Sequence, residues 1–236
     1  MDGSLVGTLL FGFVLGLKHA LDADHLVAVS TMVGRSRSLW RSAWVGVAWG
    51  IGHTASLIVA AVAVILLRVT IPPAVALGME LCVGLMLIVL GGDLIRRVAT
   101  GKITIHSHVH EHADHRHVHL HVHTDAAQHV HHGVGRRPFI VGLVHGMAGS
   151  AALMLFVLST IANPLVGLLY VAIFGAGTIG GMLAMSALIG LPFAVASVRL
   201  SALLGRLQLA VGVGSVAFGV FYTWQVAVAD RLFASF

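Results

Sequence analysis

The sequence predicts an all-helical, polytopic membrane protein in which six transmembrane helices form a 3+3 inverted repeat. Three observations support this fold class. Hydrophobic residues make up 58% of the chain and charged residues only 10%, whereas a typical soluble domain holds roughly 25% charged residues. Apolar runs long enough to span a bilayer as a helix, about 20 residues, recur six times. Finally, the two halves of the chain resemble each other at a fixed offset.

The six apolar segments define the expected elements and domains. They cover residues 4–33, 42–67, 74–95, 138–162, 165–195 and 203–229. Several exceed the length of a single span, so we expect tilted or broken helices among them. The chain then divides into a first three-helix repeat over residues 1–95, a loop over 96–137 and a second three-helix repeat over 138–236.

Lysine and arginine residues orient these helices. Eleven of them lie in or beside the first, third and fifth connections, and only Arg68 and Arg231 lie on the opposite side. Positively charged loops stay in the cytoplasm. We therefore predict a multi-pass protein of the cell membrane with both termini outside and the 96–137 loop inside. The short basic clusters explain the net charge of +5, so the expected partner is the bilayer and not nucleic acid.

The repeat has an offset of about 126 residues. Residues 16–19 (Gly-Leu-Lys-His) match 142–145 (Gly-Leu-Val-His), and residues 49–54 resemble 174–178. The third helices match at Glu80, Gly84, Gly91 and at Gln208, Gly212, Gly219. Because a unit of three helices is odd, its second copy must enter from the opposite side of the membrane. Inverted repeats are a recurring plan in transporters, with the binding site near the midplane.

The first predicted span contains a charged motif that a bilayer disfavours. Residues 18–25 hold two imidazoles, two carboxylates and an ammonium group. Each ionisable group at bilayer depth costs about 2.5–3.5 kcal/mol, so such a group indicates a functional site. Imidazole and carboxylate ligands suit divalent first-row metal ions. On a regular helix His19, Asp22 and His25 share one face, and a break within the motif would bring in Asp24 as well.

Two further histidines lie at a similar depth. At 1.5 Å per residue, His19 lies roughly 20 Å below the outer face, while His53 and His145 lie roughly 15 and 10 Å above the inner face. These levels nearly coincide in a hydrocarbon core about 30 Å thick. The predicted metal site therefore consists of His19, Asp22, Asp24, His25, His53 and His145. For His53 or His145 alone, a hydrogen bond between helices remains an alternative.

Other charged residues have simpler explanations. Glu80 begins the third span, and we favour a position at the membrane interface over one in an outer vestibule. Asp93 next to Arg96 and Arg97 predicts an ion pair at a helix end. Lys18 either neutralises an empty acidic site or pairs with a carboxylate. Cys82 is the only cysteine, so a thiolate-rich site for soft metals is excluded.

The loop between the third and fourth spans has a different composition. Residues 106–132 contain twelve of the sixteen histidines, and such tracts are typical of metal binding. Without a core, we expect the tract to be disordered when it is free of metal. Its candidate ligands are His108, His110, His117, His119, His121 and His123. The loop could buffer, sense or hand over ions, with a cytoplasmic metallochaperone as a candidate partner, or be dispensable for transport.

The motifs carry a family resemblance. Residues 19–25 match the His, four residues, Asp-His signature of the nickel/cobalt transporter family, and residues 50–54 (Gly-Ile-Gly-His-Thr) are similar to its second-helix motif. The six-span length and residues 142–150 resemble its short UreH-like relatives, and the histidine-rich loop resembles the nickel/cobalt efflux branch. The resemblance implies transition-metal transport, with His19, Asp24 and His25 at the signature positions and His53 in the second motif.

Residues and resemblance together predict a secondary transporter of Ni²⁺ or Co²⁺, with no enzymatic activity and no tightly bound cofactor. The ion would bind between the two halves, whose rocking would expose it alternately. Zn²⁺ is the nearest competing cargo, because ligand type discriminates poorly among these ions. The alternatives are a metal sensor or store built on the histidine-rich loop and a membrane metalloenzyme, whose HxxxH or HExxH patterns no span contains.

Overall fold

Outside the loop, helices form almost all of the residues that the structure describes. The computed structural model describes residues 3–33, 38–100, 104–112, 115–123, 135–148, 157, 161, 163–195 and 201–229. The α-helices in this part are α1 (Gly3–His19), α2 (Ala23–Val33), α3 (Leu39–Ala61), α4 (Pro73–Ala99), α5 (Arg136–Ala148), α7 (Pro164–Val195) and α8 (Ser201–Trp224). Two π-helical turns, η1 (Val62–Leu66) and η3 (Gln225–Ala229), extend α3 and α8. The strands β1 (Thr104–His112) and β2 (His115–His123) form a hairpin.

The long apolar helices confirm a multi-pass membrane protein. Four of them can cross a bilayer by length and composition: Leu39–Leu66, Pro73–Ala99, Pro164–Ala194 and Leu203–Val228. The bent pair α1 and α2 passes the same test together and would make a fifth span. The predicted span over 138–162 is described continuously only as far as Ala148. Six spans in a 3+3 arrangement therefore stay a prediction, as do the domain limits.

The first predicted helix is broken inside the charged motif. The axes of its two parts, Leu5–His19 and Ala23–Val33, differ by 56°. The backbone N–H groups of Leu21 and Asp22 donate to the carbonyls of Lys18 and His19, a short turn that ends α1. Asp24 then lies in the first turn of α2, where its charge is favourable to the helix dipole. The segment 4–33 is therefore a broken helix, and the break lies within the motif, where it brings in Asp24.

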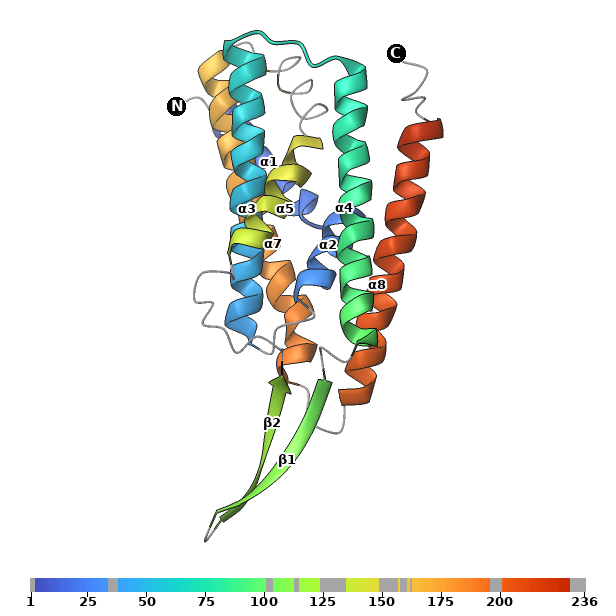
Figure 1. Ribbon diagram of the computed structural model, residues 1–236. Coiled ribbons are helices and arrows are strands. Elements are labelled where there is room, and N and C mark those ends of the chain that lie inside the picture. Colours follow the sequence, from blue (N-terminus) through green and yellow to red (C-terminus); the bar gives the residue numbers. More distant parts are fainter. Residues whose placement is uncertain are drawn as a thin grey trace.

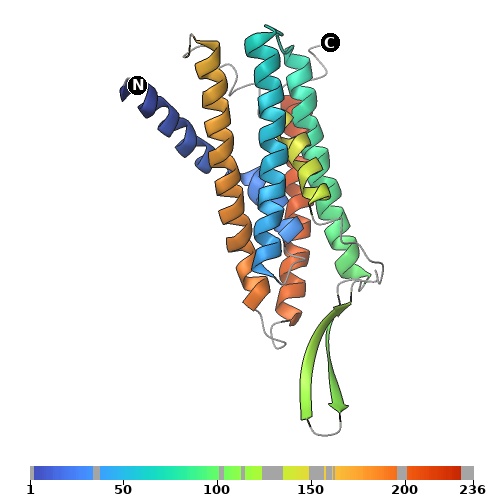
Figure 2. The ribbon, with the colours of Figure 1, turned by 90° about the vertical axis from the view of Figure 1, so that its left-hand side faces the viewer.

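The helices pack as two groups that meet through α2 and through a contact of α4 with α5. In the first group, called here the four-helix body, α3 packs along α7, α1 packs against α7 and α5 packs against α3; Figure 2 shows α1 beside α7. In the second, the α4/α8 pair, the two helices pack along each other (Figure 1). The α2 helix contacts α3, α4, α7 and α8. We call the side on which α4 begins the Pro73 side and the opposite side the hairpin side (Figure 1).

Glycines allow the closest of these helix contacts. A Cβ atom on Gly16 of α1 would overlap a backbone carbonyl of α7, and one on Gly177 of α7 would overlap a carbonyl of α1. Gly52 and Gly142 make the corresponding contacts between α3 and α5. Further glycines join α4 to α8, at Gly84 with Gly219 and at Gly91 with Gly212. Such small residues let helix backbones approach where apolar burial supplies no driving force between helices in lipid.

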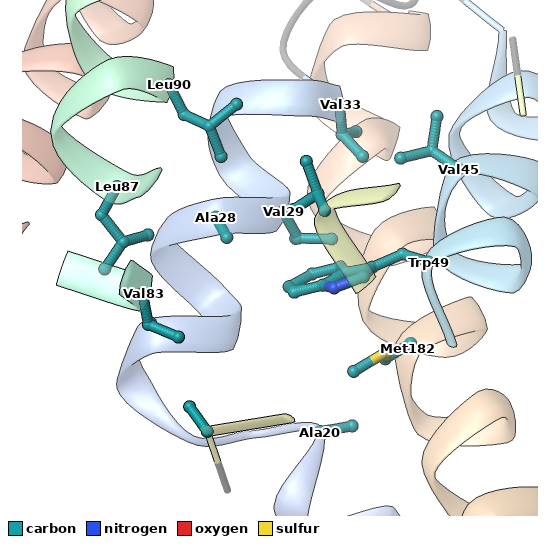
Figure 3. Packing of buried hydrophobic residues seen from close by; sticks show 12 residues of the cluster. Ala20, Ala28, Val29, Val33, Val45, Trp49, Val83, Leu87, Leu90 and Met182 are labelled. Atoms are coloured by element: carbon teal, nitrogen blue, oxygen red, sulfur yellow. The ribbon is translucent and has the colours of Figure 1, made fainter. Parts of the chain in front are cut away.

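The main hydrophobic core surrounds α2. Ala28, Val29 and Val33 of α2 lie between apolar side chains of α3 and of α4 (Figure 3). Trp49 of α3 and Leu87 of α4 are fully buried in this cluster. The core therefore holds α2, which carries part of the charged motif, in a fixed position between the two helix groups.

The described part of the histidine-rich loop is an antiparallel hairpin, where the sequence analysis expected disorder. Its register opposes four pairs of histidine positions at every second rung: His106 with His121, His108 with His119, His110 with His117 and His112 with His115. Valine and isoleucine alternate with histidine in part of both strands, a period of two that favours strand pairing. The all-helical fold class therefore holds for the described membrane helices and not for this loop.

Candidate metal centre

The helix break arranges three polar side chains of the motif around one point. His19 is the last residue of α1, whereas Asp24 and His25 lie in the first turn of α2. The ring centroids of His19 and His25 are 4.6 Å apart. His25 is almost completely buried, and His19 and Asp24 are partly buried. The bend thus turns a linear motif into a compact group of ligands.

The α3 helix contributes His53, which is 0% exposed. Its Nε2 lies 3.3 Å from His19 Nε2, and its ring centroid is 5.3 Å from that of His25. Because the neighbouring Gly52 lets α5 approach the α3 backbone, the residue next to this histidine also fixes the position of α5.

The α5 helix contributes His145, which is 3% exposed. Its Nε2 donates to Asp24 Oδ2 at 3.0 Å. The other carboxylate oxygen, Oδ1, accepts from His25 Nδ1 at 3.0 Å and from the His25 backbone N–H at 2.9 Å. An ionised carboxylate only accepts hydrogen bonds, so Asp24 bridges two imidazoles that are 120 residues apart in the chain.

Three imidazole nitrogens of the cluster remain available. Among the described residues, none forms a hydrogen bond with His25 Nε2, His53 Nδ1 or His145 Nδ1, although all three atoms are buried. A buried polar atom without a partner costs about 1–3 kcal/mol and calls for an explanation. A bound cation that replaces the missing partner provides one.

The distances fit a metal ion after small adjustments. The ligand atoms of His19, His25 and His53 lie within 4.8 Å of one another, and so do those of Asp24, His25 and His145. Zinc, as an example of a first-row ion, binds imidazole nitrogen at about 2.0–2.1 Å, which places two ligands of one ion roughly 3–4 Å apart. Imidazole suits zinc, copper, iron and nickel, and carboxylate suits harder ions. The chemistry of the set therefore fits a divalent transition metal.

Asp22 takes a different place from Asp24. Its Oδ2 accepts from His19 Nδ1 at 2.8 Å, and its side chain is 52% exposed. A regular helix favoured Asp22 as the ligand, but the break turns Asp24 to the other histidines instead. The structure thus brings together His19, Asp24, His25, His53 and His145 and leaves Asp22 at the edge, where it orients His19. That any of them binds metal stays a prediction.

The cluster borders a cavity of about 60 Å³, several times the roughly 10–15 Å³ that one water requires. Its lining adds four residues to the five clustered ones: Glu80, Val83, Ala148 and Tyr222. Glu80 therefore lines the site, although the sequence analysis favoured a place at the membrane interface. Helical periodicity could have shown this, because Glu80 lies three and four residues before the buried Val83 and Gly84. No sequence signal singled out Tyr222.

The remaining charged residues of the analysis lie elsewhere. Asp93 pairs with Arg96 and Arg97 at 3.2 and 3.0 Å, which confirms the ion pairs at the end of α4. It also accepts from Arg137 Nη2 at 2.9 Å, so it links α4 to α5. Lys18 is exposed. The candidate loop ligands all lie on β1 or β2, and metal binding by them stays a prediction.

Comparison with known proteins gives one relative over the full length. The chain is 39% identical over 233 residues to the urease accessory protein UreH of Bacillus sp. (strain TB-90), and the alignment covers 97% of this chain and 96% of UreH. No family model and no solved structure matches the chain. Identity of this extent over nearly the entire length of both proteins agrees with the resemblance seen at the charged motif. The chain belongs to the UreH-like branch of the nickel/cobalt transporter family.

Proposed function

We propose that this protein is a secondary transporter of divalent transition-metal ions, with Ni²⁺ as its cargo and Co²⁺ as the second choice. One observation carries the proposal: four histidines and Asp24 from α1, α2, α3 and α5 meet at a helix break among long apolar helices. Family membership supports the same cargo. Under this proposal the chain is not an enzyme and holds no resident cofactor, and the metal ion is its substrate.

The ligand types favour these ions over other cations. Cu⁺ selects thiolate and thioether ligands, and Mg²⁺ selects oxygen ligands, whereas this cluster offers four imidazoles and one carboxylate. Zn²⁺ remains the nearest alternative cargo, because imidazole and carboxylate suit it as well. UreH is named as an accessory protein of urease, and we propose metal supply as the corresponding role of this chain.

The depth of the site supports transport. His53 lies roughly 20 Å from both ends of the span Leu39–Leu66, at 1.5 Å per residue. Broken helices at the midplane are typical of transporter binding sites, because the helix ends and the freed backbone groups face the ion. A site at equal distance from both faces can be opened to either side by a modest movement.

The glycine contacts support the inverted repeat. Gly16 of the first repeat contacts α7, which belongs to the second repeat. The equivalent glycine of the second repeat, Gly142, contacts α3, which is the equivalent of α7 in the first repeat. In the α4/α8 pair, the contact of Gly84 with Gly219 is likewise equivalent under the repeat to the contact of Gly212 with Gly91. Exchange of the two halves would produce these pairings. Each helix group then contains helices of both halves, so we place the moving boundary between the four-helix body and the α4/α8 pair, and not between the sequence halves.

The hairpin supports one alternative function. Its four opposed pairs of histidine positions would suit a metal sensor or store that does not transport. A chain that lacks residues 104–123 separates the two functions: continued flux excludes the sensor or store as the whole function, and loss of every response to metal supports it.

The test is ⁶³Ni²⁺ flux in proteoliposomes with the gradient imposed in each direction and with Co²⁺ and Zn²⁺ as competitors. We compare the intact protein with His19→Ala. Flux that disappears in the variant supports an intramembrane transport site, and competition ranks the cargoes. Absence of flux in the intact protein in both directions overturns the proposal.

A further inference from the structure

We propose that Glu80, on the α4/α8 pair, is a further ligand of the transported ion and provides the second negative charge of the site. This inference rests on the proposed function. It concerns a residue outside the charged motif and outside the second-helix motif.

One cavity brings Glu80 together with the clustered histidines. Its lining includes Glu80 and Val83 of α4 and Tyr222 of α8. The five clustered residues, His19, Asp24, His25, His53 and His145, line the same cavity. Glu80 begins the buried stripe of α4, since Val83, Leu87 and Leu94 follow on the same face and are nearly or completely buried. The face therefore directs Glu80 toward protein and not toward lipid.

The charge of the cargo requires a second anion. Asp24 is the one carboxylate among the clustered ligands, and each of its oxygens already accepts from a histidine. Asp22 does not line the cavity and is 52% exposed. A divalent cation at bilayer depth is costly unless opposite charges compensate it. Two carboxylates, Asp24 and Glu80, make the loaded cavity neutral.

Two buried imidazole nitrogens of the cluster suit an ion shared with Glu80. His25 Nε2 and His53 Nδ1 are buried and have no hydrogen-bond partner among the described residues. The cavity, at about 60 Å³, has room for a partly hydrated ion between these histidines and Glu80. Such an ion would satisfy the imidazoles and the carboxylate together.

An ion bound by Glu80 would join the two helix groups on the Pro73 side. Glu80 lies about 10 Å from the beginning of α4, at 1.5 Å per residue, so it is on the Pro73 side of the site. His53 and His145 belong to the four-helix body, whereas Glu80 belongs to the α4/α8 pair. An ion bound to both would hold the two groups together on the Pro73 side, and its release would let them separate.

The test uses the full-length purified protein with the variants Glu80→Gln, Glu80→Asp and Glu111→Gln. Glu111 is the other glutamate of the chain and lies on β1, so Glu111→Gln is a matched control. Ni²⁺ affinity is measured by calorimetry, and Co²⁺ absorption reports the coordination of the ion. Flux is measured in proteoliposomes, and size-exclusion profiles and thermal unfolding verify folding.

We expect Glu80→Gln to weaken Ni²⁺ binding about tenfold or more, as loss of a group around a metal does, and to change the Co²⁺ spectrum. Glu80→Asp should restore part of the affinity, and Glu111→Gln should behave like the intact protein. If Glu80→Gln does not fold, Glu80→Asp decides, because a shortened carboxylate must still shift the affinity and spectrum of a ligand.

Two other outcomes overturn the inference. If a folded Glu80 variant keeps the Ni²⁺ affinity and the Co²⁺ spectrum of the intact protein, Glu80 is not a ligand, whether or not flux falls. The proposed function still stands in that case, provided that the intact protein binds and transports Ni²⁺. An intact protein that neither binds nor transports Ni²⁺ overturns the proposed function itself, and the ligand role with it.

Discussion

Two histidine-rich regions of this protein are built in opposite ways. The four membrane histidines come from α1, α2, α3 and α5, are spread over 126 residues of sequence and converge through long-range packing. The hairpin histidines lie within 20 residues of one another and are related by a local strand register. The first region is a buried site that exists only when the whole bundle is folded, whereas the second repeats one local pattern. We therefore expect selectivity and transport from the first and capacity from the second.

The strongest test of this contrast removes the carboxylate that joins the membrane histidines. We expect Asp24→Asn to lower Ni²⁺ affinity by about 100-fold or more, beyond the effect of losing an outer-shell group, and to abolish flux, because an amide cannot accept from both His25 and His145 with the strength of an anion. Calorimetry and ⁶³Ni²⁺ flux measure it. Asp22→Asn is the comparison and should lower Ni²⁺ affinity and flux by less, since Asp22 orients His19 alone. Equal losses in the two variants would contradict the distinction drawn between these carboxylates.

A substitution in the packing, away from any ligand, tests whether the membrane site depends on tertiary contacts. A Cβ atom at Gly52 would overlap the carbonyl oxygen of Phe139 in α5. We expect Gly52→Ala to destabilise the protein by about 1–3 kcal/mol and to weaken Ni²⁺ binding, because it moves α5 and hence His145. Thermal unfolding and calorimetry measure both effects. Gly214→Ala in α8 should be tolerated, because nothing lies within 4 Å of the added Cβ atom. If both substitutions lowered stability and Ni²⁺ affinity equally, the explanation through α5 would be wrong.

Deletion of residues 104–123 tests the other half of the contrast. We expect the shortened protein to bind fewer Ni²⁺ ions per chain at saturation while ⁶³Ni²⁺ flux continues, because the clustered ligands lie on α1, α2, α3 and α5 and not on the hairpin. Equilibrium dialysis counts the ions. A matched chain in which the hairpin histidines are replaced by serine controls for loop length. Loss of flux in both chains would make the hairpin part of the transport path.

The smallest expected effect concerns the ion pairs between the two regions. Arg137 near the start of α5 donates to Asp93 at the end of α4, at 2.9 Å, just where the chain leaves for the hairpin and returns. Because Arg137 is 43% exposed, Arg137→Gln should lower the free energy of unfolding by only about 0.2–1 kcal/mol. Thermal unfolding measures this loss, with Arg96→Gln as the comparison. The Arg96 side chain is 70% exposed, so its replacement should lower the free energy of unfolding by no more than Arg137→Gln does. A large loss at Arg137 alone would reveal a structural role in joining α4 to α5.

Much of the site could be predicted from the sequence, because ionisable residues are rare in apolar segments. His19, Asp24, His25, His53 and His145 stand out for that reason. Helical rise alone placed His19, His53 and His145 at similar depths. The choice between Asp22 and Asp24 depended on whether the first helix is regular or broken, and the 56° break turns Asp24 toward the histidines. The sequence analysis assigned Glu80 to the membrane interface because the residue lies near the start of its span. It did not consider which face of the helix carries Glu80, and that face lines the cavity.

The sequence by itself determined the apolar spans, the chemistry of the motif and the alternating pattern of the hairpin, because hydropathy, ligand type and strand period are local properties. The tertiary structure decided the rest. The 56° bend at residues 20–22 and the glycine contacts of α3 with α5 determine which side chains meet. The grouping of α4 with α8 brings Glu80 to the cavity. These features depend on helix backbones fitting against one another across the bundle, and no run of neighbouring residues records that fit.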